Sequence, residues 1–165
     1  MFPMNFNTTL LIPCFLILVL TSFCQAAIGQ TLAVGDPIPV ISAKDQFGTN
    51  FILTTNLQCL LVVKEMACAK SANHKLADQG AGFLEKHGAA YLMDIHTMPG
   101  IARFFAFPKL RKYPERIVLV DTAEALARFP MQDGEVTVLS LTPELRIKKI
   151  SYWKPDSDPV ANVFE

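Results

Sequence analysis

The residue whose type and position best suit chemistry is Cys68. Four residues separate it from the apolar run CLLVV at 59–63, and it precedes a segment, 70–87, whose apolar spacing predicts a helix. A cysteine at a helix amino terminus beside cations ionises readily, because its pKa falls from about 8.5 toward neutrality. This stretch therefore indicates a candidate nucleophilic thiol, with an unreactive core cysteine as the open alternative. The nearby cations are Lys64, Lys70 and His74.

Cys59 is the other cysteine beyond residue 30, and it begins the apolar run that ends at Val63. Five or more extended residues at about 3.3 Å each place it beyond the roughly 7 Å Cα separation of a disulfide. Its position inside an apolar strand predicts a core residue. Exchange through a mixed disulfide needs a second thiol, which the hydroxyl of Ser71 cannot replace. We therefore predict no bridge between Cys59 and Cys68.

The three histidines lack the spacing of a metal site. His74, His87 and His96 form no HxH or HxxxH pair, and no carboxylate cluster accompanies them. His87 is expected at a helix carboxyl terminus, where it interacts with the last carbonyls. The sequence has no GxGxxG, P-loop or GxSxG motif. We therefore expect neither a metal nor a cofactor.

The stretch IARFFAFPKLRKYPER, residues 101–116, mixes apolar and basic side chains. Such a stretch could bind a partner or an anionic membrane surface. The favoured interpretation is an amphipathic helix whose apolar face packs on the core, followed by a solvated basic loop. Its apolar anchors would be Ile101, Phe104, Phe105 and Phe107. Its cations form a candidate partner surface of Arg103, Lys109, Arg111 and Lys112.

Length and charge bound the remaining possibilities. The 165 residues predict one domain, and 15 basic against 15 acidic residues argue against a nucleic-acid partner. Residues 9–28 contain no charged side chain, and small residues occur near the end of this stretch at Ala26, Ala27 and Gly29, as in a secretory signal peptide. We therefore expect a signal peptide over 1–29, a single domain over 30–165, and a periplasmic or secreted protein.

The alternative is a leader that is retained as an inner-membrane anchor, because Met1–Asn7 contains no Lys or Arg. Against it, the apolar stretch is short for a bilayer span, which needs about 20 residues. A lipid anchor at Cys24 is disfavoured by the bulky Phe23 before it. We expect membrane contact only through an uncleaved leader.

The apolar pattern predicts a lead-in arm over 31–57 with a turn at Phe47–Asn50, and a basic loop between Pro108 and Pro114. Two strand–helix–strand crossovers followed by antiparallel strands predict an α/β fold, with a central mixed sheet flanked by helices and a C-terminal β-hairpin. The expected strands are 59–63, 89–95, 116–121, 125–129, 136–141 and 145–153. The expected helices are 70–87, 99–107 and a short one at 159–164.

Several of these pieces together resemble the thioredoxin-like superfamily over Gly35–Phe129. GDPIPVISAKDQFGTNFIL is similar to the lead-in arm of peroxiredoxins and of exported thioredoxin-like thiol proteins. CAKS stands where thioredoxins carry CxxC, so Cys68 matches the first cysteine and Ser71 replaces the second. The resemblance also implies a cis-proline facing Cys68, for which Pro114 is the candidate. The chain looks like an exported branch of the superfamily that lacks the CxxC pair.

The missing dithiol decides the functional expectation. The leading hypothesis is a non-catalytic protein of the cell envelope that binds another protein or a peptide. The alternative is a monothiol oxidoreductase, or a peroxiredoxin-like thiol protein, that uses Cys68. Peroxiredoxins carry a proline and a Thr or Ser before the reactive cysteine, whereas KEMAC has neither. Glu65 occupies the place of the hydroxyl residue, and its carboxylate would oppose thiolate formation.

Overall fold

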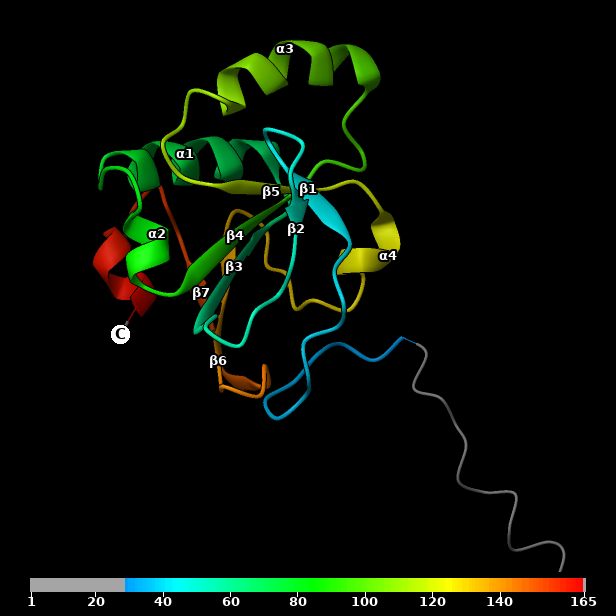
Figure 1. The fold of residues 1–165 in the computed structure, drawn as a ribbon, viewed down its shortest axis with the longest axis vertical. Helices are drawn as coiled ribbons and strands as arrows, with labels where there is room; N and C mark the ends of the chain where they lie inside the picture. The colour runs from blue at the N-terminus through cyan, green and yellow to red at the C-terminus, as the bar shows by residue number, and fades with distance from the viewer. Residues whose placement is uncertain (1–28, 165) are drawn as a thin grey trace, which may run out of the picture. The chain divides into compact units, whose positions relative to one another are not determined.

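Three apolar runs of the sequence form the parallel centre of one β-sheet (Figure 1). They are β3 (Cys59–Val63), β4 (Ala89–Asp94) and β5 (Ile117–Val120). The computed structural model describes residues 29–164, within which the strand order is β2-β1-β5-β4-β3-β6-β7. All residues of β3 and β5 are buried, as central parallel strands covered on both faces require. The strands predicted at these three runs are confirmed.

Antiparallel strands complete both sides of this centre. β1 (Ala43–Asp45) pairs with β5, and it pairs with β2 (Asn50–Phe51) across a turn in which the Asp45 N–H donates to the Thr49 carbonyl at 2.8 Å. On the other side, β6 (Val136–Leu141) pairs with β3 and then with β7 (Ile147–Trp153). The mixed sheet and the C-terminal hairpin are therefore as predicted.

The beginning of the arm is tied to the end of the sheet. The Gly35 N–H donates to the Ile147 carbonyl at 2.8 Å, and the Ile147 N–H donates to the Asp36 carbonyl at 2.9 Å. The Ile38 N–H donates to the Leu145 carbonyl, also at 2.9 Å. These bonds hold the arm against the start of β7, and one more backbone pair, Pro37 with Arg146, lies between them.

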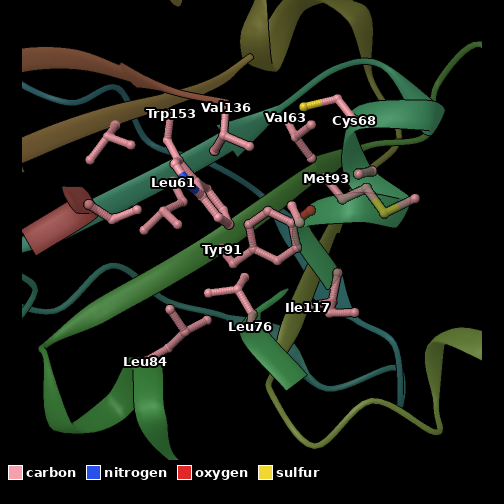
Figure 2. Packing of buried hydrophobic residues seen from close by; sticks show 14 of the residues in the cluster. Leu61, Val63, Cys68, Leu76, Leu84, Tyr91, Met93, Ile117, Val136 and Trp153 are labelled. Carbon is pink, nitrogen blue, oxygen red and sulfur yellow. The ribbon is translucent and has the colours of Figure 1, made fainter. Parts of the chain in front are cut away.

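Alternation along the strands divides the core between the two faces of the sheet. Leu61 and Val63 of β3 belong to one apolar cluster, whereas Leu60 and Val62 belong to the other. The first cluster is covered by α1 (Met66–Ala77), and Figure 2 shows Leu76 of that helix among its members. The arm and α4 (Ala123–Leu126) contribute to the second cluster. The sheet is thus apolar on both faces.

The helix predicted over 70–87 is wrong in its bounds, because the chain forms two helices there. After α1, Gly80 and Gly82 adopt φ values of 87° and 73°, a left-handed conformation that interrupts helical hydrogen bonding. α2 (Phe83–Lys86) then begins where the Glu115 carboxylate accepts the N–H groups of Phe83 at 2.8 Å and Leu84 at 3.2 Å. A carboxylate from a distant part of the chain fixes this helix start, so local spacing did not reveal it.

Two further sequence predictions need correction. α3 (Gly100–Leu110) extends beyond the predicted 99–107 and includes Pro108, which is tolerated because it removes only one N–H bond near the helix end. The strand predicted at 125–129 is wrong, because this segment holds part of α4 and a following turn.

The short C-terminal helix is present as the 3-10 helix η1 (Val160–Phe164). Among residues 29–164, no helix is long and apolar enough to cross a bilayer. The predicted signal peptide or anchor, with Cys24 and the small residues Ala26 and Ala27, lies outside the described residues.

Candidate functional site

Cys68 is the third residue of α1, just beyond the carboxyl end of β3. Only 4% of it is exposed, and it belongs to the apolar cluster between α1 and the sheet. Figure 2 shows its sulfur directed toward Val63 on the neighbouring strand. The expected position in the first helical turn is therefore found, but the thiol faces the protein interior.

The electrostatic surroundings of this thiol oppose ionisation. Burial, followed by the negative charges of Glu65, Asp156 and Glu135, raises the pKa of the Cys68 thiol to about 11. Glu135 precedes β6 and Asp156 follows β7, so two of these carboxylates reach Cys68 from the C-terminal hairpin. The lowered pKa expected from neighbouring cations is wrong, whereas the opposing effect expected of Glu65 is confirmed.

The predicted cations are not among the groups that shift the pKa of Cys68. Lys64 and Lys70 are both exposed. His74 is exposed as well, and its ring lies edge-on to Tyr113 with 5.7 Å between the ring centroids. The sequence predicted two influences that favour the thiolate, nearby cations and a place in the first turn of a helix. Of these, the structure has the place in the first turn.

Neither Ser71 nor Cys59 provides a second thiol. Ser71 lies three residues farther along α1 and is half-buried. Cys59 begins β3, at the opposite end of that strand from Cys68, and burial raises the pKa of its thiol to about 12. Both cysteines within the described residues are free, so the prediction of no bridge between them is confirmed.

Pro114 does not face Cys68. It precedes the amino end of β5, whereas Cys68 follows the carboxyl end of β3, and these two strands run in the same direction on either side of β4. Between residues 29 and 164 no peptide bond is cis, so the expected cis-proline is wrong. The antiparallel neighbour of β3 at its Cys68 end is β6, and the residues directly before β6 are Gly134 and Glu135 instead of a proline.

A buried phenol lies close to Cys68. Tyr91 of β4 is fully buried, and its hydroxyl is the buried side-chain group of the described residues for which the structure provides no hydrogen-bond partner. Burial, followed by proximity to Cys68 and Tyr113, raises the pKa of Tyr91 well above its usual value. This tyrosine was missed from the sequence because it sits within an apolar run and resembles any other core residue.

A polar pair also lies at the carboxyl edge of the sheet. The buried Asp94, at the end of β4, accepts the His96 N–H at 3.0 Å, and its Oδ1 lies 2.7 Å from the His96 ring Nδ1. Both residues line a hollow of about 600 Å³, together with Lys64, Thr31, Leu126, Phe129 and Met131. The sequence signal for this pair was the order Asp-x-His directly after an apolar strand.

The four cations of the candidate partner surface have two different roles. Arg103 forms a bidentate ion pair with Asp121 and donates from Nε to the Met98 carbonyl at 2.9 Å. Arg111 donates from Nε to the Gln46 carbonyl at 3.0 Å. These two arginines therefore attach α3 to the rest of the protein. Lys109 and Lys112 are exposed.

The other histidine expectation concerned His87. It caps the carboxyl end of α2, and its ring Nδ1 lies 2.9 Å from the Phe83 carbonyl, which confirms the predicted interaction with a terminal carbonyl. Its ring also stacks on Phe164 at a centroid distance of 4.3 Å. His87 is therefore occupied in joining α2 to η1.

Searches of protein-family models and of curated proteins found no match to this chain. Solved structures do match. A peroxiredoxin-like protein from Aquifex aeolicus has a TM-score of 0.52 at 13% identity, with 77% of this chain and 80% of that one covered. A peroxidoxin from Mycobacterium tuberculosis has a TM-score of 0.52 at 14% identity, with 76% and 90% covered.

The thioredoxin domain of a thiol-disulfide oxidoreductase from Bacteroides vulgatus is similar to the same extent. Its TM-score is 0.51 at 15% identity, with 82% of this chain and all of that domain covered. Identities this low speak for the fold and not for the activity of the matched proteins. The fold of this chain is therefore thioredoxin-like.

Proposed function

We propose that this chain is a non-catalytic binding or accessory protein of the cell envelope, exported and built on a thioredoxin-like fold without a dithiol. The observation that carries the proposal is the state of Cys68, which is buried beside three carboxylates. With a pKa of about 11, only about one thiol in ten thousand is ionised at pH 7. Because the thiolate is the reactive form, this position is poorly suited to redox chemistry.

The hollow at the carboxyl edge of the sheet offers a place for the partner, which we take to be an envelope protein or a peptide. Its lining combines apolar side chains, Leu126, Phe129 and Met131, with the polar groups of Lys64 and His96. Asp94 orients the His96 ring through the contact at Nδ1, which leaves Nε2 available to a ligand. A polypeptide supplies both kinds of complementary group, carbonyl or carboxylate oxygens and apolar side chains.

The alternative is a monothiol oxidoreductase that uses Cys68. Its support is the position of this cysteine in the first turn of α1, where the helix dipole favours the thiolate. For this reading, the first turn of α1 would have to open to expose the sulfur. Peroxide reduction by Cys68 belongs to the same alternative and needs the same exposure.

The rate of alkylation at Cys68 separates the two readings. The protein is treated with iodoacetamide from pH 6 to 10, and modification of the Cys68 peptide is followed by mass spectrometry. We expect the native protein to react more than about a hundredfold more slowly at pH 8 than the same protein unfolded in urea. Fast native alkylation with a midpoint below about pH 8 would establish the monothiol reading instead.

A second measurement addresses binding. A photo-crosslinking side chain is placed at Met131 in the hollow, with the exposed Glu144, in the turn between β6 and β7, as the matched control. We expect a discrete adduct with an envelope protein from position 131 that disappears in Lys64→Glu. Equal labelling from both positions would contradict the placement of the partner in this hollow.

A further inference from the structure

The apolar stripe of α3 faces away from the protein. Ile101, Phe104 and Phe105 are spaced three and four residues apart, so they share one side of the helix, and they are 75%, 76% and 63% exposed. The two phenyl rings contact each other edge to face, with centroids 5.4 Å apart. The core helix favoured by the sequence analysis, with these residues docked inward, is therefore wrong.

The opposite side of α3 makes the contacts with the fold. Leu110 is buried, and Ala106 and Phe107 pack against the core cluster on the α1 side of the sheet. Arg103, on the same side, donates to the carbonyls of Ile95 and Met98 and pairs with Asp121. These attachments fix the orientation of the helix, so the outward stripe is held in place and is not displaced by local helix rotation.

The charged side chains of the segment that contains α3 have a single sign. Residues 95–114 contain no Asp or Glu, although the whole chain has as many acidic as basic residues. Lys109 lies one turn beyond Phe105 on the same side of the helix, and Lys112 follows in the turn after α3 ends at Leu110; both lysines are exposed. The surface formed by Ile101, Phe104, Phe105, Lys109 and Lys112 is called here the α3 outer surface.

We infer that the α3 outer surface docks on an anionic phospholipid bilayer. Phe104 and Phe105 enter the boundary between headgroups and acyl chains, while Lys109 and Lys112 contact lipid phosphates. A segment without acidic residues, in which exposed phenyl rings are followed by exposed lysines, complements the apolar boundary and the negative charge of an anionic membrane, whereas a protein groove would have to supply carboxylates for these lysines. This inference does not depend on the proposed function, because its surface differs from the hollow at the carboxyl edge.

The test uses the full chain with a tryptophan reporter. In Phe104→Trp, insertion is read as quenching by brominated acyl chains in phosphatidylglycerol vesicles. The matched control is Val34→Trp, because Val34 is 63% exposed but belongs to another part of the fold. It precedes Gly35, which bonds to the edge strand β7, whereas α3 is attached to residues that follow β1 and β5. The native Trp153 is 2% exposed and is common to all variants.

We expect quenching of the Phe104→Trp reporter with anionic vesicles, and none with phosphatidylcholine vesicles or with the Val34→Trp control. Adding Lys109→Glu and Lys112→Glu should weaken binding by at least about tenfold. An unquenched reporter at position 104 would overturn the inference and assign the surface to a protein partner. Equal quenching at positions 34 and 104 would also overturn it, because the leader alone would then explain the association.

Discussion

Replacement of Tyr91 by phenylalanine should stabilise the protein. The hydroxyl of this fully buried residue lies among apolar groups and Cys68 and has no hydrogen-bond partner within the described residues. A buried polar group without a partner costs about 1–3 kcal/mol, and phenylalanine keeps the ring while removing the oxygen. For a folded unit of about 135 residues the unfolding entropy is about 0.3 kcal/mol per kelvin, so Tm should rise by about 3–10 °C.

The assay is thermal and urea unfolding of wild type, Tyr91→Phe and a matched control, Tyr152→Phe. Tyr152 is only half-buried, on β7, and its hydroxyl is not among the buried side-chain groups without a partner, so removing that hydroxyl should change the free energy of unfolding by less than about 0.5 kcal/mol. A Tyr91→Phe protein that is less stable than wild type would refute the reasoning. It would mean that the hydroxyl is hydrogen-bonded in solution, for example to a buried water.

Three other substitutions test the fold. Asp45 accepts the N–H groups of Phe47 and Thr49, and although burial alone would raise its pKa, these bonds and the Arg116 side chain lower it. The ionised Asp45 carboxylate therefore stabilises the folded state above about pH 4, and this stabilisation is lost as pH falls through the lowered pKa. Urea unfolding should show that Asp45→Asn lowers the free energy of unfolding by about 1–3 kcal/mol at pH 7 and changes it little near pH 2. Cys59→Ser should cost about 1–3 kcal/mol by burying an unpaired hydroxyl, and an unchanged urea midpoint would contradict its place in the core. Gly88→Ala should cost more than Gly134→Ala in the same assay, because both have a positive φ but only the Gly88 Cβ would lie 2.9 Å from a backbone oxygen.

The central strands could be predicted from sequence because their signal is local. Each is a short apolar run bounded by polar residues. A strand that is covered on both faces is apolar at every position, so the run itself is enough to predict the strand. The break between α1 and α2 was harder, because the turn at Gly80 and Gly82 and the capping carboxylate of Glu115 act together from different parts of the chain.

The direction of the α3 stripe was not available from spacing. Ile101, Phe104 and Phe105 have the periodicity of a core-facing helix, and the same periodicity is consistent with either side facing inward. The orientation follows from the inward contacts of Phe107 and Leu110 together with Arg103, whose guanidinium pairs with Asp121 directly after β5. A pairing between residues this far apart cannot be deduced from one sequence.

The environment of Cys68 combines near and distant contributions. Glu65 is a sequence neighbour, and its opposing effect was expected. Glu135 and Asp156 approach only because β6 returns antiparallel beside β3 and β7 follows it. Pro114 was assigned to the wrong end of the sheet for the same reason, since the identity of the strand next to β3 depends on topology and not on order along the chain.

The bonds between the arm and the start of β7 affect the order in which the chain folds. Gly35 and Ile38 donate their N–H groups to the carbonyls of Ile147 and Leu145, and the Asp36 carbonyl accepts the Ile147 N–H, so these bonds of residues 35–38 form only after most of the chain has been synthesised. Contacts between segments this far apart require closure of a long loop and form late in folding. The amides of Gly35 and Ile38 should therefore gain protection from hydrogen exchange late in folding, and lose it early when the protein opens locally.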